Sequence, residues 1–395
     1  MNRRRLSIAY FTNTDVRAGV EEHILTLLRG LDRRRFRPFL ICPPALIELI
    51  QADIPADVEI LPLNLVEPSQ FGAAWGLARF LRAKRIDVLH SHMFRSSWLA
   101  SPVGWLCHVP LIVETAHGRE DWRRGWLKAR FVVDRAVGRF VGAYISVSRG
   151  CAEYLVNQKG LPAGKIHVIP NGCDLDRFSG SFGKSAAMRD ALGLGNGQPV
   201  LVVIGRLEPQ KGHAVLLESL VRIRAEFAHV HLVCVGEGSL TDSLKAQTSR
   251  LGLTEQVHFA GYQRNPEDWL AMADIAVLPS FYEGMPLVAI EALAAGRAIV
   301  ATAVDGTSEV VVDGKTGLTV PPGNAAALAE AICRLLRNPA ERCALGVAGR
   351  QWVLENFSEN TQLRRTQELY LRLLGERRSM NTEGVDEKSG EPSTV

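Results

Sequence analysis

The chain has 395 residues, of which 47% are hydrophobic and 22% are charged, and its formal net charge is +4. This composition excludes a fibrous or disordered protein, and the length favours two globular domains. So small a net charge gives no reason to expect a nucleic-acid partner. The seven cysteines are scattered without a CxxC pair, so we expect free thiols in a reducing compartment rather than a disulfide framework or a zinc site.

Basic residues gather in three places in the first half of the chain. One interpretation is a solvated surface. The other is a face that docks on anionic lipid headgroups, where each nearby basic residue contributes about 1 kcal/mol. The clusters are Arg3, Arg4 and Arg5, then Arg33, Arg34, Arg35 and Arg37, and finally Arg123, Arg124, Lys128 and Arg130 beside Trp122 and Trp126.

No segment reads as a secretory signal, because the arginines of residues 3–5 are not followed by a long apolar core. The longest uncharged stretch, between Arg95 and Glu114, is interrupted by Pro102 and Pro110. It favours a buried helix followed by a strand over a membrane span. We therefore expect a cytoplasmic protein, or a peripheral one on the inner face of a membrane.

Short apolar runs alternate with amphipathic helical stretches, which is typical of parallel sheets covered by helices. A strand at Leu6–Phe11 precedes a loop with Gly19 and a helix at Val20–Leu31. We expect one doubly wound, Rossmann-like domain over residues 1–175. Its further strands are Phe36–Cys42, Val58–Leu63, Asp87–Ser91, Leu111–Thr115, Ala143–Val147 and Ile166–Ile169.

Residues 171–199 contain Pro, Gly and Ser, and their apolar residues show little regular helical or strand spacing. We therefore assign residues 176–198 to an interdomain connection. A second Rossmann-like domain is expected at 199–356. A C-terminal helix at 357–376 would pack back toward the first domain, and 377–395 would be a disordered tail. The expected elements are strands at Val200–Gly205, Val230–Val235, Val257–Ala260, Ile275–Pro279, Ala298–Thr302 and Leu318–Val320, and helices at Ala325–Arg337, Ala340–Asn356 and Asn360–Leu374.

Two doubly wound α/β domains that face each other across a cleft predict a ligand at the carboxyl ends of the strands. Dehydrogenases share this outline. Gly236-Glu237-Gly238 begins a GxGxxG pattern, but Thr241 takes the third glycine position, and the first strand has no such pattern. Both observations count against a nicotinamide cofactor.

The strongest motif is FYEGMPLVAIEA at residues 281–292, directly after a predicted strand. Glu283 lies in the loop, Pro286 suits the first turn of a helix, and Glu291 lies farther along that helix. The positive end of a helix favours phosphate, and a carboxylate can accept hydrogen bonds from the hydroxyls of a sugar or ribose. The alternative is a buried glutamate at a strand-to-helix turn.

The second motif is VVIGRLEPQKG at residues 202–212, where a strand ends at Gly205. Arg206 and Lys211 then stand on the loop and at the start of the next helix. Two cations in this position can hold a diphosphate and stabilise the charge that develops on a leaving phosphate. The alternative is a pair of exposed surface cations.

These motifs, together with VIPNGCD at 168–174 and the stretch from Gly306 to Gly317, resemble the retaining nucleotide-sugar glycosyltransferases of family 4. The resemblance covers roughly residues 6–374. It implies the two-domain GT-B fold and transfer of a hexose-type sugar from a nucleoside-diphosphate sugar, most commonly a UDP-sugar, to a hydroxyl acceptor. A polysaccharide or glycolipid pathway of the cell envelope would be the setting.

The resemblance also implies roles for individual residues of the second domain. Arg206 and Lys211 would hold the donor diphosphate, Glu291 would bind the ribose hydroxyls, and Glu283 would contact the transferred sugar. Arg206, Lys211 and Glu283 would thereby serve catalysis as well as binding. The backbone that would line the sugar and phosphate is that of Gly284, Met285, Pro286 and Leu287.

In the first domain, Gly19 matches the second glycine of the family's turn near the donor phosphates, while Ala18 replaces the first. His117 follows a predicted strand where the family has a histidine that faces the transferred sugar. It could hydrogen-bond a sugar hydroxyl and orient the reacting carbon. A lone histidine at a strand end is otherwise structural. His90 and His92 are weaker candidates for a role near the acceptor.

Asp174-Leu175-Asp176 has the spacing of a metal-binding DxD, but the resemblance assigns the diphosphate to basic residues. We therefore expect neither a metal nor a cofactor. The family's mechanism is front-face attack, in which the leaving phosphate helps accept the acceptor proton. Two alternatives stay open: a nucleotide-sugar epimerase of the same fold, and a non-catalytic sugar-nucleotide-binding partner of a membrane complex.

Overall fold

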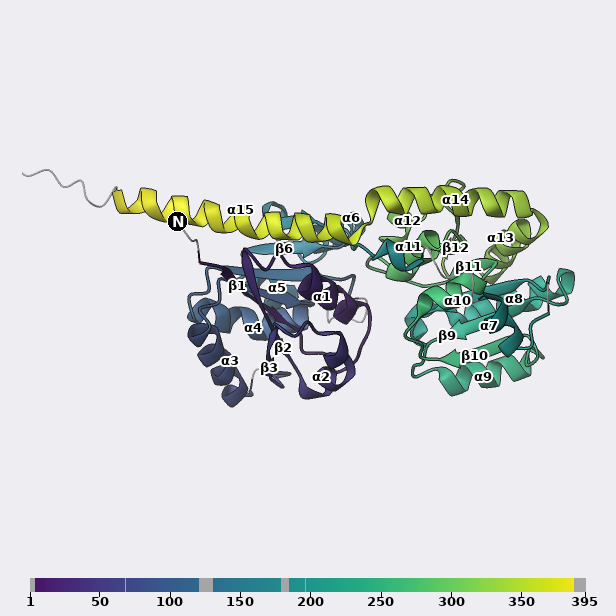
Figure 1. Cartoon of the computed structure of the whole chain (residues 1–395), viewed down its shortest axis with the longest axis horizontal. Coiled ribbons are helices and arrows are strands. Elements are labelled where there is room, and N and C mark those ends of the chain that lie inside the picture. Colours follow the sequence, from purple (N-terminus) through teal and green to yellow (C-terminus); the bar gives the residue numbers. More distant parts are fainter. Residues whose placement is uncertain (1–3, 68, 121–130, 179–184, 196, 387–395) are drawn as a thin grey trace, which may run out of the picture. The chain divides into compact units, whose positions relative to one another are not determined.

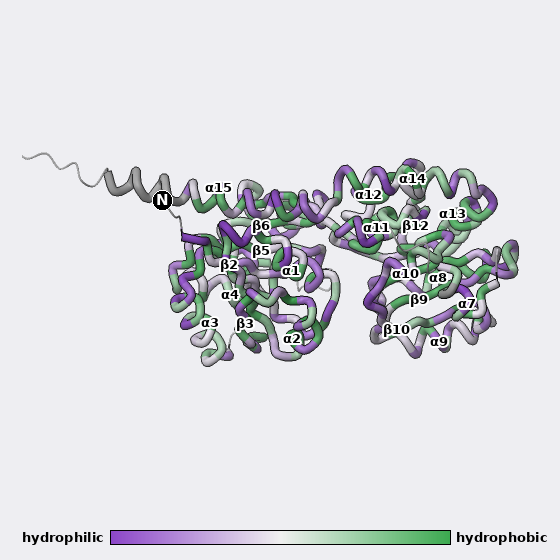
Figure 2. Tube along the Cα trace, viewed as in Figure 1, coloured by the Kyte–Doolittle hydropathy of each residue, from purple (hydrophilic) through white to green (hydrophobic). Residues whose placement is uncertain are grey.

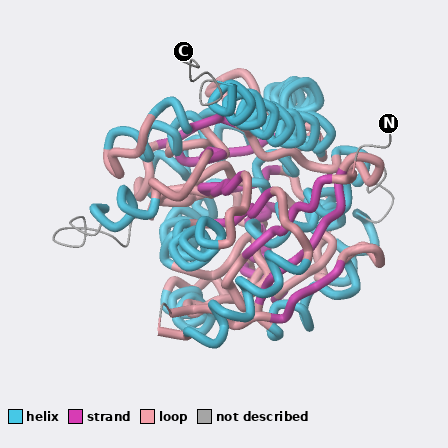
Figure 3. The backbone as a smooth tube through the Cα atoms, turned by 90° about the vertical axis from the view of Figure 1, so that its left-hand side faces the viewer, coloured by secondary structure: helices cyan, strands magenta, loops and turns pink. Residues whose placement is uncertain are grey.

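The computed structural model describes residues 4–67, 69–120, 131–178, 185–195 and 197–386 (Figure 1). It divides into two compact units. The first holds the chain up to Val147, Cys151–Ile169 and everything from Asn360 onward, and the second holds Ser148–Gly150 and Pro170–Glu359. Each unit contains one parallel sheet with helices around it; Figure 3 shows the strands in magenta and the helices in cyan.

The first unit contains a seven-stranded sheet of order β3-β2-β1-β4-β5-β6-β7, in which all neighbouring strands are parallel. Its central strands are almost fully buried, because helices cover both faces and apolar side chains can point either way. The strands are β1 (Leu6–Phe11), β2 (Phe36–Cys42), β3 (Glu59–Pro62), β4 (Val88–His92), β5 (Leu111–Ala116), β6 (Ala143–Ser146) and β7 (Ile166–Val168).

Alternation along β1 shows how the two faces are filled. Ile8 and Tyr10 point into one apolar cluster, which α1, α2 and α15 complete, whereas Ala9 and Phe11 point into another, which α3, α4, α5 and α6 complete. The helices of this unit are α1 (Gly19–Gly30), α2 (Pro44–Ile50), α3 (Phe71–Ala83), α4 (Phe94–Leu106), α5 (Phe131–Val137), α6 (Arg149–Asn157) and α15 (Glu359–Asp386).

The second unit contains a six-stranded parallel sheet of order β10-β9-β8-β11-β12-β13. Its strands are β8 (Val200–Ile204), β9 (His231–Val235), β10 (Val257–Gly261), β11 (Ile275–Leu278), β12 (Ala298–Thr302) and β13 (Leu318–Val320). Its helices are α7 (Ser185–Ala191), α8 (His213–Glu226), α9 (Thr241–Arg250), α10 (Pro266–Met272), α11 (Leu287–Ala294), α12 (Thr307–Val310), α13 (Ala325–Arg337) and α14 (Pro339–Asn356).

Asparagine caps set the starts of two helices near the end of this unit. The side chain of Asn324 accepts a hydrogen bond from the backbone N–H of Ala327 at 3.0 Å, and Asn338 accepts one from Glu341 at 3.1 Å. Each satisfies a backbone donor that has no partner within the helix. The starts of α13 and α14 are therefore encoded locally.

The segment expected as an interdomain connection belongs to the second unit, which begins at Pro170 rather than after residue 198. A 3₁₀ turn at Leu175–Phe178 packs against α10 and α11, and α7 packs against α10. These contacts explain the difference, because the segment adds to the sheet's helical cover instead of spanning between sheets.

Helix α15 belongs to the first unit, although it follows the whole second unit in sequence. Apolar and polar residues alternate along it (Figure 2), and Leu363, Leu369, Tyr370 and Leu374 enter the cluster that Ile8 and Tyr10 also form. The helix runs on to Asp386, past its expected end at residue 376. No helix within the described ranges is long and apolar enough to cross a bilayer.

Candidate active site

Two loops of the second unit meet at the carboxyl ends of β8 and β11. The backbone at Gly212 has φ 68°, and a Cβ there would lie 2.0 Å from the carbonyl oxygen of Pro279. Only glycine fits this left-handed, crowded position. The close approach places the residue before it, Lys211, beside the loop that follows β11.

Hydrogen bonds hold these two loops together. The backbone N–H of Phe281 donates to the carbonyl of Gln210 at 2.8 Å, and the Gln210 side-chain amide donates to the carbonyl of Tyr282 at 2.8 Å. The loop residues are thus fixed by backbone contacts as well as by side chains. Such rigidity keeps the flanking charged groups in place for a ligand.

Lys211 and Glu283, both predicted site residues, form an ion pair across this junction. Lys211 Nζ lies 2.6 Å from Glu283 Oε1, and the Ser280 hydroxyl donates to the same oxygen at 2.7 Å. The Glu283 side chain is only 7% exposed, whereas that of Lys211 is 20% exposed. Arg206, at the start of the same loop, is exposed to solvent.

The helix after this loop begins one residue later than predicted. Pro286 is the N-cap of α11, with φ −74° and ψ 111°, and the first helical residue is Leu287. Glu291 follows one turn later and is half-buried. It lies near Cys173. Burial first, and then the negative charge of Glu291, raise the pKa of the Cys173 thiol.

The predicted backbone segment 284–287 is held from two sides. Gly306 approaches it so closely that a Cβ there would lie 1.9 Å from the carbonyl oxygen of Gly284. The Asn171 side-chain amide donates to the carbonyl of Met285 at 3.3 Å. No role for Asn171 is predicted from the sequence, although its place in the VIPNGCD motif was the available signal.

The turn before α1 shows why alanine can replace the family's first glycine. Ala18 has φ −151° and ψ −164°, an extended conformation open to any residue. Its backbone N–H donates to Glu21 at 2.9 Å, which fixes the start of the helix, and Gly19 stands exposed as the first helical residue. The neighbouring Arg17 pairs with Glu22 and Asp53, each at 2.6 Å.

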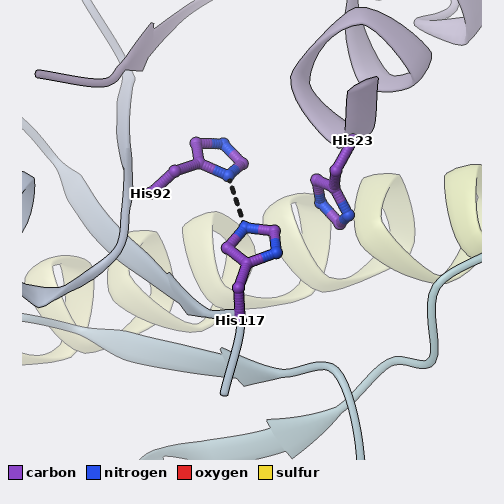
Figure 4. A group of neighbouring side chains, drawn as sticks. All are labelled: His23, His92 and His117. Carbon is purple, nitrogen blue, oxygen red and sulfur yellow. Dashed lines mark hydrogen bonds between the residues drawn. The ribbon is translucent and has the colours of Figure 1, made fainter. Parts of the chain in front are cut away.

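His117 lies in the first unit, within a cluster of histidines from three elements (Figure 4). His117 Nε2 lies 3.1 Å from Nδ1 of His92, at the end of β4. The ring of His23, on α1, meets the His117 ring edge to face with centroids 4.7 Å apart. Burial first, and then the neighbouring histidines, hold the pKa values of His92 and His117 well below their ordinary range, so both rings are neutral at pH 7.

His90 is a structural residue rather than an acceptor contact. It is fully buried, and its two ring nitrogens lie 2.6 Å from the hydroxyls of Tyr370 and Thr115. His92 is also fully buried, but its Nε2 atom has no hydrogen-bond partner. His23 was missed from the sequence, because nothing in a helix marks one histidine as facing a second one far along the chain.

A cavity of about 710 Å³ opens in the first unit at the carboxyl ends of β1, β4 and β5. It lies next to the histidines, because Met93 directly follows His92. Met93 adopts φ 69°, a strained backbone conformation of the kind that gathers at functional sites. The lining residues are Asn13, Thr14, Asp15, Val16, Met93, Phe94, Arg95, Trp98, Glu120 and Val133.

A buried ionic cluster supports one wall of this cavity. Lys159 Nζ lies 2.7 Å from Glu120 Oε1 and 2.9 Å from Asp134 Oδ2, and it stands 4.6 Å from the centre of the Phe94 ring. Glu114 lies near these charges, and its burial raises its pKa to about 7 against the opposing effect of Lys159. Loss of Lys159 would therefore leave carboxylates buried without a cation.

The DxD sequence is exposed and satisfies its own backbone, since a carboxylate oxygen of Asp174 accepts a hydrogen bond from the N–H of Asp176 at 3.2 Å. Within the described ranges, the three histidines His23, His92 and His117 are the group of side chains able to hold a metal ion together. Gly19 and His117 belong to the first unit, and the other predicted site residues belong to the second.

Comparison with known proteins identifies both halves of the chain. Residues 17–177 match the family described as Glycosyltransferase Family 4, and residues 198–338 match Glycosyl transferases group 1. A GDP-mannose-dependent α-(1-6)-phosphatidylinositol monomannoside mannosyltransferase of Mycolicibacterium smegmatis is 34% identical over 284 residues, or 69% of this chain and 72% of that relative. The chain belongs to glycosyltransferase family 4. The predictions of family, of GT-B fold and of sugar transfer are confirmed.

Other similar proteins vary in what they act on. A D-inositol 3-phosphate glycosyltransferase of Xylanimonas cellulosilytica is 33% identical over 287 residues, which is 67% of each chain. The structure of Anabaena HepE in complex with UDP and glucose has a TM-score of 0.82 at 20% identity, and the match covers 92% of this chain and 99% of HepE. This likeness shows the GT-B fold of the family 4 glycosyltransferase. Membership of a transferase family favours transfer over the epimerase and the non-catalytic alternatives.

Proposed function

We propose that this glycosyltransferase moves a sugar from a nucleoside-diphosphate sugar, most commonly a UDP-sugar, to a hydroxyl acceptor, with retention at the anomeric carbon and without a metal ion. The observation that carries the proposal is the contact between Lys211 and Glu283 beside the exposed Arg206. It joins a phosphate-binding cation and a hydroxyl-binding carboxylate at one edge of a sheet, where open α/β folds bind their ligands.

The ion pair suggests how the donor would be received. A diphosphate offers Lys211 a second anionic partner, and Arg206 can add bidentate hydrogen bonds because its guanidinium is exposed. Glu283 then accepts hydrogen bonds from sugar hydroxyls. As charge grows on the departing diphosphate, both cations stabilise it more strongly than they stabilise the ground state.

The remaining predicted residues would position the donor. Glu291 would accept hydrogen bonds from the ribose hydroxyls, and the backbone at 284–287, held by Asn171 and Gly306, would line the sugar and phosphate. Gly19 would leave room for phosphate near the start of α1. His117, neutral at pH 7, would hydrogen-bond a hydroxyl of the transferred sugar.

Retention would follow from front-face attack, with the leaving phosphate accepting the acceptor proton. A covalent route would need a carboxylate nucleophile, and the hydrogen bonds that Glu283 Oε1 accepts from Lys211 and Ser280 lower the nucleophilicity of this carboxylate. The acceptor would bind in the cavity of the first unit. Its polar edge of Asn13, Thr14 and Asp15 beside apolar side chains suits a glycolipid or a sugar chain.

Donor screening followed by single variants tests this proposal. One nucleotide sugar should stabilise the protein and be slowly hydrolysed, with undiminished activity in EDTA and a product that keeps the donor's anomeric configuration by NMR. Arg206→Ala, Lys211→Ala and Glu291→Ala should each lose activity while still folding, as a cooperative thermal transition would show. Lys245→Ala, an exposed lysine on α9, is the matched control. Full activity in all three variants would refute the donor site.

We also propose that the first unit docks on an anionic membrane, but through a face other than the predicted clusters. Arg33 pairs with Asp57 at 2.6 Å, and Arg37 pairs with Glu59 at 3.3 Å, so acidic neighbours offset these charges. Arg4 likewise pairs with Asp87. Arg3 and the cluster of Arg123, Arg124, Lys128 and Arg130 with Trp122 and Trp126 lie outside the described residues.

The proposed docking surface is the outer side of α3, α4 and α5, where α4 contacts both of the other helices. Aromatic rings with arginines suit the boundary between headgroups and acyl chains. The one acidic residue of these helices, Asp134, is buried against Lys159. Exposed here are Phe71, Trp75, Trp98, Trp105, Leu106, Val132 and Val133, with Arg79, Arg82, Arg95 and Arg135.

Vesicle sedimentation separates the two surfaces. Vesicles containing an anionic phospholipid should bind the protein, and neutral vesicles should bind it weakly. Trp75→Ala and Trp105→Ala should each weaken binding, while Arg33→Gln, in the ion-paired cluster, should leave it unchanged. Binding that is indifferent to lipid charge, or to both tryptophans, would refute this surface.

A further inference from the structure

We propose that His23, His92 and His117 form a binding site for a transition-metal ion, with Zn²⁺ as the probe that tests it. The three side chains come from α1, from the end of β4 and from the loop after β5, so the fold rather than a local motif brings them together (Figure 4). Occupancy of this site would block the role proposed for His117. Binding itself does not depend on that role.

The geometry is close to that of a three-histidine site. One ring nitrogen of each histidine lies within 4.8 Å of such a nitrogen in the other two. Ligand nitrogens of tetrahedral zinc, at about 2.0–2.1 Å from the metal, stand roughly 3.3 Å apart. Nδ1 of His92 and Nε2 of His117 are already 3.1 Å apart, so a small movement of the His23 ring completes the set.

The surroundings also suit a metal. His92 is fully buried, and the one partner of its ring is Nε2 of His117, another nitrogen that a metal ion can bind. His23 Nδ1 lies 2.9 Å from the side-chain amide of Gln362, and with the amide turned over its oxygen accepts from Nδ1–H. Metal-bound histidines commonly have such an outer partner. His90 is not a ligand, because both of its nitrogens are occupied.

The site would leave one coordination position open. His117 is the least buried of the three, so a water or a substrate hydroxyl can reach the metal from its side. A metal there binds Nε2 of His117, the nitrogen that faces His92, and so holds this ring toward His92 and away from a sugar hydroxyl. We therefore infer reversible inhibition: the transferase works without metal, and a transition-metal ion competes with the donor.

Binding is measured first on the full chain with Cys343→Ser and His231→Ala. These changes remove an exposed thiol and one half of the His231–His258 pair of the second unit, whose ring nitrogens are also 3.1 Å apart. One equivalent of Co²⁺ should give the visible absorption of a tetrahedral complex, and Zn²⁺ should displace it. His23→Asn and Gln362→Ala should each weaken binding at least roughly tenfold.

Zinc-edge anomalous diffraction uses crystals of the unsubstituted protein, so its result does not depend on whether a variant folds. A peak among the three rings supports the site, and peaks confined to surface residues overturn it. In transfer assays, Zn²⁺ should inhibit the wild type competitively with the donor, and EDTA should relieve it. Metal binding without inhibition keeps the site but counts against the role of His117, whereas inhibition unchanged in His23→Asn counts against the site.

Discussion

The ammonium group of Lys211 lies 2.6 Å from the carboxylate of Glu283, and the two residues follow different strands, β8 and β11. Both side chains are largely buried, so water cannot fully solvate the charge of one when the other is removed. A proposed phosphate ligand and a proposed sugar ligand thus fix each other before any donor arrives. Their coupling should be visible in kinetics as well as in stability.

We expect Lys211→Ala and Glu283→Ala each to lower kcat/KM by about 10²- to 10³-fold, the usual cost of losing one such electrostatic contact. The double variant should lose much less than the product of the two effects, because each change already disables the pair. Steady-state kinetics on all four proteins completes the cycle. Independent, multiplicative losses would contradict a shared function.

The crowding at Gly212 predicts a stability difference between two glycine-to-alanine changes. Gly212→Ala forces a Cβ against the Pro279 carbonyl at φ 68° and should destabilise the second unit by several kcal/mol, about 1–3 of them from backbone strain alone. Gly375→Ala, in α15 with open space around it, should stabilise by roughly 0.5–1 kcal/mol. Thermal melts of the two variants should shift in opposite directions.

Burial of Glu114 predicts a pH dependence of stability. Its folded pKa of about 7 exceeds its ordinary 4.5, so the folded state keeps a proton that the unfolded state releases. Stability should therefore fall as pH rises from 4.5 to 7, by roughly 3 kcal/mol in total, and then level off. In denaturant unfolding of Glu114→Gln, the free energy of unfolding should not fall in this way between pH 4.5 and 7. If it falls as in the wild type, another group causes the pH dependence.

Lys159 should be needed for folding of the cavity wall. Lys159→Met leaves Glu120 and Asp134 buried without their cation, at a cost of about 3–5 kcal/mol. Arg337→Met, which breaks exposed ion pairs with Glu226 and Glu330, should destabilise the protein far less, because solvent screens both pairs. Chemical denaturation of both variants compares the buried and exposed ion pairs directly.

The sheets were predictable because parallel strands buried on both faces appear as short apolar runs. Leu6–Phe11 and Ala298–Thr302 were predicted with the ends that the structure has. Pro286 was predicted in the first turn of the helix, but it is the N-cap residue of α11. Proline is compatible with both positions. The segment around α7 was expected to be a connection, because its few apolar residues find packing partners only in the folded chain, against α10.

The candidate site was predictable as far as its motifs are local. The loops with Lys211 and Glu283 follow strands directly, and their meeting follows from β8 and β11 being neighbours. The histidine cluster was not predictable in this way. His23 meets Gln362, and His90 meets Tyr370, through partners far away along the chain that only the packing of α15 brings near.

The place of α15 has a consequence for the order in which the protein folds during synthesis. The ribosome releases the strands of the first unit early, yet Leu363, Leu369 and Tyr370, which close one side of that sheet, leave it only after the second unit. Until then, part of that apolar face lacks its cover and His90 lacks its partner Tyr370. The residues of the second unit are nearly contiguous and all leave the ribosome before α15 does, so this unit can fold before the first unit is complete.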